Sequence, residues 1–390
     1  MNILILSHMY PNKINPVYGI FVHEQAKELV RQGCDVRVIS PVAWTPFPIK
    51  YLSAKWKAYS EIPLKQNWEG IEVYYPRYLS FPRSFLLSTS GWLCYYGMKS
   101  LISQIYKDFK FSLIHAHAML PSGYTAMILK YKYNKPVVLT IHGVDAYFAV
   151  YKYRKTAIKI LKGVNKIIAV SSVIKKILDN YIEPNKIAVI NNGVPTGKIF
   201  LKKSTIRNEY SSKKVILSVG NLIEQKGHLY VLKALKKLGK KYQETIYLII
   251  GIGPEERKLR KYVIEYGLSQ NVKFLGLIPH QKVMEYMSTC DIFVLPSWNE
   301  AFGVVYVEAM AHGKPVIACK GEGIEDVITD KKTGLLVNSK DSDSLVNAFD
   351  FLLSHSEKAQ EIGEKGRRTV LEKYTWSKNA QKNIEVYGEL

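Results

Sequence analysis

Two short apolar runs, joined by a helix-like segment, constrain the fold of this 390-residue chain most strongly. Residues 291–295 and 315–319 have the length and composition of strands that are buried on both faces. Between them, residues 302–312 predict a helix, with Gly303 near its start and Gly313 where a left-handed residue ends a helix. Two strands connected through a helix lie parallel in one sheet. The chain is therefore predicted to be an α/β protein.

The same alternation of apolar runs and helical patterns extends along the whole chain. In the N-terminal half a helix is expected at 20–32, and strands are expected at 2–6, 35–39, 71–75, 112–116, 136–141, 166–170 and 186–190. In the C-terminal half strands are expected at 214–219, 245–250, 271–275, 291–295, 315–319 and 334–337, followed by helices at 342–353, 357–373 and 375–387. This pattern predicts mainly parallel, doubly wound sheets.

A polar and basic stretch without periodicity, residues 195–212, is the predicted linker between two such domains. The domains are then residues 1–196 and 197–372, with a final amphipathic helix within 373–390. Ligands of open α/β sheets bind beyond the carboxyl ends of the strands. We therefore expect the active site in the cleft to which both sheets point.

Two glutamates flank the start of the central helix: Glu300 in the preceding loop and Glu308 in the second turn. The helix is otherwise apolar on nearly every face, so a carboxylate there is costly to bury unless it accepts hydrogen bonds. Helical side chains lean toward the N-terminus, so Glu308 points back to the free first-turn amides. A phosphate suits such amides, and a carboxylate suits a vicinal diol such as the ribose hydroxyls. In the alternative interpretation, Glu300 is an N-cap neighbour and Glu308 a partly exposed surface residue.

The segment resembles the signature of retaining GT-B glycosyltransferases of family 4: Glu-x7-Glu within Pro-Ser-x-x-Glu-x-Phe-Gly…Glu-Ala-Met-Ala-x-Gly-x-Pro-Val-Ile-Ala. Further matching segments are Ser7-His-Met-Tyr-Pro, Thr140-Ile-His-Gly-Val-Asp145, Ala169-Val-Ser-Ser172 and Asn191-Asn-Gly-Val194. The opening is most similar to the branch with teichuronic-acid and lipopolysaccharide-type enzymes. The resemblance implies two Rossmann-like domains facing across a cleft, with the last helix crossing back to an acceptor-binding N-terminal domain. It also implies that Glu300 lies beside the donor sugar and Glu308 holds the nucleotide ribose.

The segment 219–227 follows a predicted strand and opens a helix, as a phosphate-binding loop does. Glycosyl transfer builds negative charge on a departing diphosphate, and a fixed cation there lowers the barrier. Lys226 is the predicted cation, although a solvated lysine at a helix start is the alternative. The family usually has Arg directly after Gly220, where this chain has Asn221. One positive charge is therefore missing, or it is supplied from elsewhere.

The remaining donor contacts are predicted from glycines and backbone amides. Gly19 follows the first strand, where a residue without Cβ lets amides approach a diphosphate or acceptor. Leu277 follows another strand and is expected to offer backbone groups to the nucleobase. His23, in the next helix, is expected at the surface. The backbone groups predicted to bind the donor near Glu300 belong to Ala301, Phe302, Gly303 and Val304.

Three histidines lie at or near the ends of two predicted strands. His115 and His117 share one face of a predicted strand, and His117 is nearer its carboxyl end. By resemblance His117 contacts the donor sugar or the acceptor. His142, two residues after the next strand, is the second catalytic candidate. In the alternative interpretation both are core histidines.

No Asp-x-Asp motif stands near a donor-binding strand end, so no metal and no cofactor are expected. The resemblance implies front-face substitution, in which the donor phosphate assists acceptor deprotonation. Paired acid and base carboxylates, as in glycosidases, are the competing mechanism. A sugar phosphorylase and a non-catalytic nucleotide-sugar-binding protein are the alternatives in function. A dehydrogenase is disfavoured because no Gly-x-Gly-x-x-Gly follows the first strand.

The formal charge of +22 is concentrated in one half of the chain. Residues 1–196 contain 25 Lys+Arg and 10 Asp+Glu (net +15), whereas 197–390 contain 30 and 23 (net +7). No nucleic-acid-binding motif is present, so an anionic membrane surface is the predicted partner, reached through the aromatic and basic stretch 44–110. A lipid-linked acceptor would fit that location. Four scattered cysteines, no signal peptide and no long apolar run predict a cytoplasmic, peripheral protein.

Overall fold

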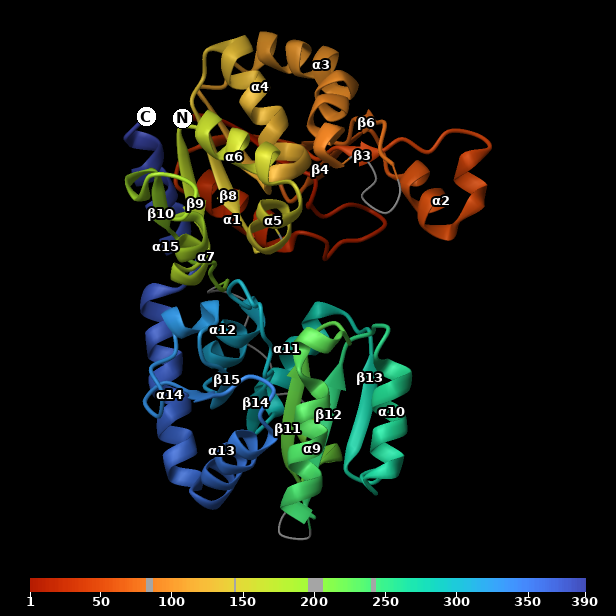
Figure 1. Cartoon of the computed structure of the whole chain (residues 1–390), viewed down its shortest axis with the longest axis vertical. Helices are drawn as coiled ribbons and strands as arrows, with labels where there is room; N and C mark the ends of the chain where they lie inside the picture. Colours follow the sequence, from red (N-terminus) through yellow and green to blue (C-terminus); the bar gives the residue numbers. More distant parts are fainter. Residues whose placement is uncertain (82–86, 144, 196–205, 240–242) are drawn as a thin grey trace. The chain divides into compact units, whose positions relative to one another are not determined.

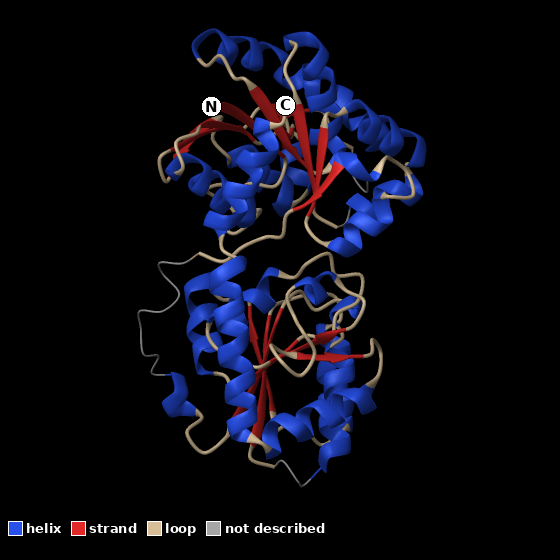
Figure 2. Cartoon of the chain, turned by 90° about the vertical axis from the view of Figure 1, so that its left-hand side faces the viewer, coloured by secondary structure: helices blue, strands red, loops and turns tan. Residues whose placement is uncertain are grey.

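The computed structural model describes residues 1–81, 87–143, 145–195, 206–239 and 243–390 (Figure 1). The chain divides into two compact units. Unit 1 contains Met1–Asn191 and Trp376–Leu390, and unit 2 contains Asn192–Thr375. Each unit has a central sheet with helices on both sides (Figure 2). Both units are therefore α/β layers of the Rossmann-like kind.

The main sheet of unit 1 has eight strands in the order β10-β9-β8-β7-β1-β2-β5-β4. All neighbouring pairs are parallel except β4–β5. The strands are β1 (Asn2–Ser7), β2 (Asp35–Ile39), β4 (Lys65–Trp68), β5 (Ile71–Tyr74), β7 (Leu113–His117), β8 (Val137–Ile141), β9 (Lys166–Ala169) and β10 (Ile187–Val189).

The antiparallel edge of this sheet is a hairpin that the apolar pattern does not predict. A two-residue turn, Glu69–Gly70, joins β4 to β5, with φ of +49° and +92°. Two left-handed residues form the turn type that matches strand twist, and glycine adopts this conformation without strain. A second, two-stranded sheet pairs β3 (Val42–Ala43) with β6 (Arg77–Tyr78).

One face of the unit 1 sheet is covered by the first and last long helices. α1 (Ile20–Arg31) and α15 (Trp376–Gly388) contact each other and share one hydrophobic cluster with Ile3 and Ile5 of β1. Leu4 and Leu6 are equally buried on the opposite face. The other helices of unit 1 include α2 (Ala54–Glu61), α3 (Ser90–Asp108), α4 (Tyr124–Tyr133), α5 (Val150–Lys152), α6 (Arg154–Gly163) and α7 (Ser172–Leu178).

Unit 2 has a six-stranded, wholly parallel sheet in the order β13-β12-β11-β14-β15-β16. The strands are β11 (Lys214–Val219), β12 (Thr245–Ile250), β13 (Val272–Gly276), β14 (Ile292–Val294), β15 (Val316–Cys319) and β16 (Leu335–Val337). The helices are α8 (Ile206–Glu209), α9 (His228–Leu238), α10 (Glu256–Glu265), α11 (His280–Thr289), α12 (Val304–Ala311), α13 (Ser342–Ser354) and α14 (Ser356–Lys373).

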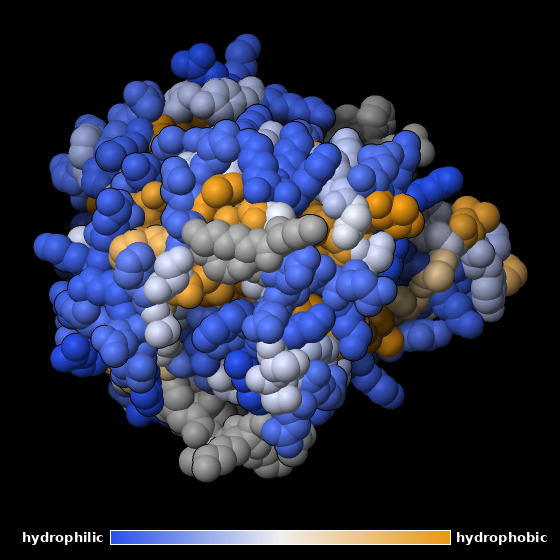
Figure 3. All heavy atoms as spheres, turned by 90° about the horizontal axis from the view of Figure 1, so that it is seen from below, coloured by the Kyte–Doolittle hydropathy of each residue, from blue (hydrophilic) through white to orange (hydrophobic). Residues whose placement is uncertain are grey.

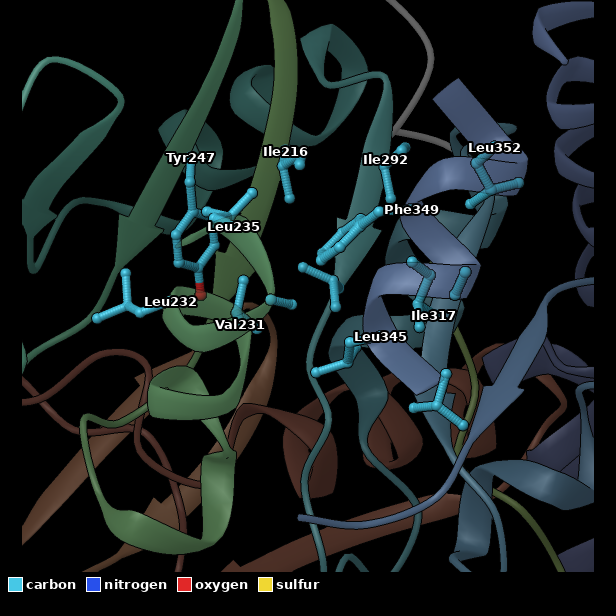
Figure 4. Close-up of a cluster of buried hydrophobic side chains, with 14 of the residues drawn as sticks. Ile216, Val231, Leu232, Leu235, Tyr247, Ile292, Ile317, Leu345, Phe349 and Leu352 are labelled. Atoms are coloured by element: carbon cyan, nitrogen blue, oxygen red, sulfur yellow. The ribbon is translucent and has the colours of Figure 1, made fainter. Parts of the chain in front are cut away.

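The core of unit 2 lies between this sheet and the helices α9 and α13 (Figure 4). Strand side chains such as Ile216, Ile292 and Ile317 face apolar side chains of both helices. The helical contributors labelled in the figure are Val231, Leu232, Leu235, Leu345, Phe349 and Leu352. This packing fixes the sheet, and the sheet in turn fixes the loops that follow its strands.

The central helix is shorter than predicted. α12 begins at Val304, because Gly303 before it has φ +77° and lies outside the helix. Gly313 has φ +71°, which confirms the predicted left-handed stop. Of the predicted linker, residues 196–205 lie outside the described residues, and Ile206–Glu209 form α8 rather than irregular chain. Within the described ranges, no helix has both the length and the apolarity to cross a membrane.

Strand order reverses direction at one point in each unit. In unit 2 the chain builds outward from β11 through β12 to β13, and then from β14 on the other side. In unit 1 the corresponding neighbours are β1 and β7. The two loops that follow such neighbouring strands diverge to opposite faces of the sheet, which leaves a crevice at their carboxyl ends. The predicted site residues of each unit follow these strands.

Candidate functional site

Three loops meet at the carboxyl edge of the unit 2 sheet. They follow β11, β14 and β15, which are neighbours in the sheet. The Trp298 amide donates to the Gln225 carbonyl (3.0 Å), and the Gly323 amide donates to the Glu300 carbonyl (3.0 Å). The loop after β14 is thus held from both sides.

An ion pair joins the first two loops across the strand-order reversal. Lys226 Nζ lies 2.5 Å from Glu300 Oε2, and the side chains are 23% and 14% exposed. Ser297 Oγ donates to the same carboxylate oxygen at 3.2 Å. The structure therefore brings together the lysine and the first glutamate that the sequence predicted separately.

The close approach of these loops depends on Gly227. Its φ is +72°, and a Cβ there would lie 2.2 Å from the Pro296 carbonyl oxygen. Any larger residue would push the loop carrying Lys226 away from the loop carrying Glu300. Gly220 opens the same loop, and its amide donates to the Ile250 carbonyl (3.0 Å). Asn221, which follows, is exposed.

Glu308 is buried, only 7% exposed, so the alternative of a partly exposed surface residue is wrong. Its Oε1 atom lies 3.0 Å from His280 Nε2, at the start of α11. The sequence predicts this carboxylate near the first-turn amides and does not predict its contact with His280. A histidine that opens a helix after a proline carries no motif, so only the contact between α11 and α12 identifies it.

Glu322 is a second functional candidate that sequence reasoning missed. Its carboxylate accepts hydrogen bonds from the amides of Asn299 (3.0 Å) and Glu300 (2.7 Å). Asn299 is left-handed, with φ +54°. Burial raises the pKa of Glu322 above its usual value, although both amide bonds act in the opposite direction. Glu322 therefore holds the strained turn that aims Glu300. A carboxylate in a glycine-containing loop directly after a strand is the sequence signal that could have found it.

The other predicted donor residues of unit 2 are backbone positions around these loops. Ala301 and Phe302 are buried, and Gly303 precedes α12, which starts at Val304. A first-turn amide has no partner within its own helix, so this end of α12 can bind an anion.

Leu277 lies farther out along the sheet. It follows Gly276 at the end of β13, which is the edge strand, and its side chain is exposed. The Gly276 carbonyl accepts from the Gly251 amide (2.9 Å). A Cβ on Gly251 would lie 1.9 Å from the Gly220 oxygen. The loop after β12, which contains Gly251, was not predicted as part of the site. It lies between the backbone beside Leu277 and the loop after β11.

Unit 1 has its own cluster at its reversal point. Gly19 precedes α1 with φ +66°, and a Cβ there would lie 2.4 Å from the Met9 carbonyl carbon. His117 ends β7, and its Nδ1 lies 2.9 Å from His142 Nε2. The His142 ring packs on Phe21 of α1, with centroids 4.7 Å apart. The two predicted histidines are therefore in direct contact.

Burial keeps the histidines of this cluster neutral. Desolvation lowers the pKa of His142 to about 3 and holds the pKa of His117 well below its usual value. Desolvation also raises the pKa of the partly buried Asp145 carboxyl to about 6, while that carboxyl accepts from the Met119 and His142 amides. Among the described residues, the buried Nε2 atom of His117 has no hydrogen-bond partner. A neutral imidazole with one open nitrogen can hold a hydroxyl group, which a core histidine with both nitrogens bonded cannot do.

The expectation that His23 lies at the surface is wrong. Its side chain is fully buried, and its Nδ1 lies 2.8 Å from the Tyr10 hydroxyl. Its ring also packs edge-on against Trp68 of the β4 strand. Burial lowers the pKa of His23 to about 4. The missed hairpin explains the error, because without β4 nothing was expected to cover this side of α1.

The structure offers no obvious metal centre in the described ranges: no three His, Cys, Asp or Glu side chains there are grouped to hold an ion. The site of unit 2 instead combines one fixed cation, a helix start, the buried Glu308 carboxylate and the partly buried Glu300 carboxylate. Such a set can neutralise a diphosphate and accept hydrogen bonds from hydroxyl groups.

Two protein-family models match the chain. The model described as Glycosyltransferase Family 4 matches residues 19–198, and the model described as Glycosyl transferases group 1 matches residues 201–369. Together they include the clusters of both units.

Similar proteins are found both by sequence and by structure. An uncharacterised glycosyltransferase of Methanocaldococcus jannaschii is 32% identical over 71% of this chain and 75% of its own. A putative teichuronic acid biosynthesis glycosyltransferase of Bacillus subtilis is 26% identical over 98% and 96%. Among solved structures, Anabaena HepE in complex with UDP and glucose has a TM-score of 0.74 at 19% identity, covering 100% of both chains.

Proposed function

Because this chain belongs to the family 4 glycosyltransferases of the GT-B fold, we propose that it transfers a sugar from a nucleotide-diphosphate donor, most simply a UDP-sugar, to a lipid-linked or saccharide acceptor. The observation that carries this proposal is the Lys226–Glu300 pair at the strand-order reversal of unit 2. Its context is the synthesis of cell-surface polysaccharide, by analogy with the teichuronic-acid relative.

Unit 2 is the proposed donor-binding unit. The diphosphate lies against Lys226 and the start of α12, where a positive charge and free amides both favour an anion. Glu308 accepts hydrogen bonds from the ribose hydroxyls, since it is buried and its described partner uses only Oε1. A phosphorylase has no ribose to bind, so Glu308 favours a nucleotide donor. The UDP complex of the structural neighbour supports the choice of UDP.

The proposed reaction retains the anomeric configuration by front-face substitution. The donor phosphate oxygen takes the acceptor proton, and Lys226 stabilises the charge that develops on the departing diphosphate. Glu300 holds hydroxyl groups of the transferred sugar and positions Lys226 before the donor arrives. In unit 1, the proposed acceptor-binding unit, His117 and His142 contact the acceptor or the donor sugar. No metal takes part in this scheme.

Donor binding should depend on Glu308. We expect Glu308→Ala to weaken binding of the nucleotide sugar by about 2 kcal/mol or more, because two hydrogen bonds to a charged acceptor are lost. Calorimetry on the folded variant measures this. His280→Ala is the matched control, since it removes the protein partner and keeps the carboxylate; its affinity should change far less. Unchanged donor affinity in a folded Glu308→Ala protein would remove the ribose assignment.

Turnover should depend on Lys226 more than nucleotide binding does. We expect Lys226→Ala to lower kcat by about 100-fold while binding of the nucleoside monophosphate changes little, because the charge matters most as the diphosphate leaves. Lys237→Ala is the control, since it removes an exposed lysine of the same unit that pairs with Asp343. Activity should also persist in EDTA. Turnover that is lost on chelation and restored by Mg²⁺ or Mn²⁺ would show that a metal ion, and not Lys226, neutralises the departing diphosphate.

We also propose that unit 1 docks on an anionic membrane surface at the cytoplasmic face. Part of the stretch 44–110 is core, because Tyr75, Cys94 and Ile102 are buried. The segment around α2 is different, because α2 has no buried residue and projects from the unit (Figure 1). Phe47 and Leu52 beside it are 78% and 75% exposed.

Charge and apolar surface are mixed in this segment. Lys50, Lys55 and Lys57 lie next to exposed aromatic and aliphatic side chains. Hydrophobic and hydrophilic groups adjoin at the right-hand edge of Figure 3, on the side where Figure 1 draws α2. Aromatic rings suit the headgroup layer, and each lysine near an anionic surface contributes ~1 kcal/mol, screened by salt.

Co-sedimentation with vesicles tests this docking. The protein should pellet with vesicles in proportion to their anionic lipid content at low salt, and less at high salt. Replacing Lys50, Lys55 and Lys57 by Glu should abolish pelleting.

The same charge change on unit 2, at Lys258, Lys261 and Lys365, is the control and should leave pelleting largely intact. Protein that stays in the supernatant with anionic vesicles at low salt would contradict docking and favour a soluble acceptor.

A further inference from the structure

The last helix of unit 1 has a row of buried polar side chains where apolar ones would be expected. Asn379, Asn383 and Tyr387 are spaced by four residues, so they lie on one face of α15. All three are at most 4% exposed. Buried polar groups are costly unless they are hydrogen-bonded, so their partners show what the row does.

The hydrogen bonds of this row start at Gln25 of α1 and continue along α15. Gln25 Nε2 donates to Asn379 Oδ1 (2.7 Å), and Asn379 Nδ2 donates to the Asn191 carbonyl (2.8 Å). Asn383 Nδ2 then donates to the Asn379 carbonyl (2.8 Å) and to its Oδ1 (3.1 Å). These bonds fix both the register and the rotation of α15 against α1.

The row ends at the sheet, directly behind the site of unit 1. The Tyr387 hydroxyl lies 2.7 Å from His115 Nδ1, and His115 Nε2 lies 2.7 Å from Thr140 Oγ1. Both ring nitrogens of His115 are thus held. Its ring packs against His117 with centroids 4.4 Å apart, and His117 in turn contacts His142.

The hydrogen bonds around His115 favour one tautomer of its ring. The Tyr387 hydroxyl also reaches Asn383 Oδ1 at 3.4 Å. If His115 carries its proton on Nδ1, it donates to Tyr387, Tyr387 donates to Asn383, and Thr140 donates to Nε2. Both ring nitrogens of His115, the Tyr387 hydroxyl and Asn383 Oδ1 then each have a partner. With the proton on Nε2, Tyr387 would donate to His115, and Asn383 Oδ1 would lose that donor.

We propose that Asn383 and Tyr387 of α15 are positioning residues for His117, acting through the His115 ring. A ring held at both nitrogens cannot turn, so it forms a fixed surface against which His117 packs. His142 fixes the Nδ1 side of His117, which leaves Nε2, buried and without a partner among the described residues, as the ring nitrogen available to a ligand. The proposal rests on the function proposed above for His117. α15 is therefore part of the site's support, even though none of its residues touches the reacting groups.

Removal of one hydroxyl tests the tautomer. In Tyr387→Phe the His115 Nδ1 proton would have no acceptor, so the proton should move to Nε2 and be donated to Thr140. Nitrogen-15 NMR of labelled histidine side chains in the full-length protein reports this as an exchange of the protonated and unprotonated nitrogen signals of His115. Tyr10→Phe is the matched control, because it removes the other buried tyrosine–histidine hydrogen bond of the same core. It should leave the His115 signals in place.

Activity tests the positioning. We expect Tyr387→Phe to lower kcat by about three- to tenfold, since small displacements of a site residue reduce rates. The Kd for the free nucleoside diphosphate should be unchanged, because unit 2 binds it. A general loss of folded protein would lower activity in proportion to the folded fraction, which thermal unfolding measures independently.

Each outcome decides the proposal. Unchanged His115 signals in Tyr387→Phe would overturn the role of the row. A changed tautomer with unchanged kcat per folded molecule would overturn the positioning of His117. His117→Ala distinguishes a failure of the function proposed for His117 from a failure of the role proposed for α15. If that variant keeps full activity, the function proposed for His117 fails, whereas the tautomer result still stands as a property of α15.

Discussion

The ion pair between Lys226 and Glu300 is the interaction on which the unit 2 site depends. It connects the loops that follow β11 and β14, and it does so where the strand order reverses and the two loops would otherwise diverge. Gly227 allows the approach, and Glu322 holds the left-handed turn before Glu300. Loss of one partner would leave a partly buried charge without compensation, which is destabilising. The sheet thus determines where the two loops lie, and the ion pair determines how their side chains are arranged.

The free-energy cost of burying charged groups also explains the other residues of the site. Glu308 is the one acidic position on an otherwise apolar helix, and it is retained next to His280 rather than exposed to water. In unit 1, neutral imidazoles take the place of charges, because burial lowers the pKa of His142 to about 3. The two units therefore present different chemistry at corresponding edges of similar sheets. A charged edge suits a diphosphate, and a neutral edge suits sugar hydroxyls.

Much of the fold could be predicted because buried parallel strands are continuous apolar runs. β2, β11 and β12 have the predicted bounds, since turns or polar residues delimit each run. β4 was not predicted, because it is an edge strand whose residues, Lys65–Trp68, alternate between exposed and partly buried positions and do not form an apolar run. His23 was misplaced for the same reason, as the hairpin that covers it was not expected.

The site was predictable where a residue type is unusual for its setting, and not where a partner is distant in sequence. Glu308 and Lys226 stood out by their chemistry and position. His280 and Glu322 did not, because their partners are a carboxylate on another helix and two backbone amides of another loop. Tyr387 contacts His115 across 272 positions of the chain, so only the folded structure relates them.

The central claim is that the carboxyl edge of unit 2 at the β11–β14 reversal binds the donor nucleotide. Hydrogen–deuterium exchange of the whole chain at saturating UDP, with GDP and ADP in parallel, tests it most directly. Binding at this edge should slow amide exchange in the loops 220–227, 297–303 and 320–323 and in the first turn of α12, with whichever nucleotide binds. Slower exchange confined to other segments while the nucleotide is bound would contradict it.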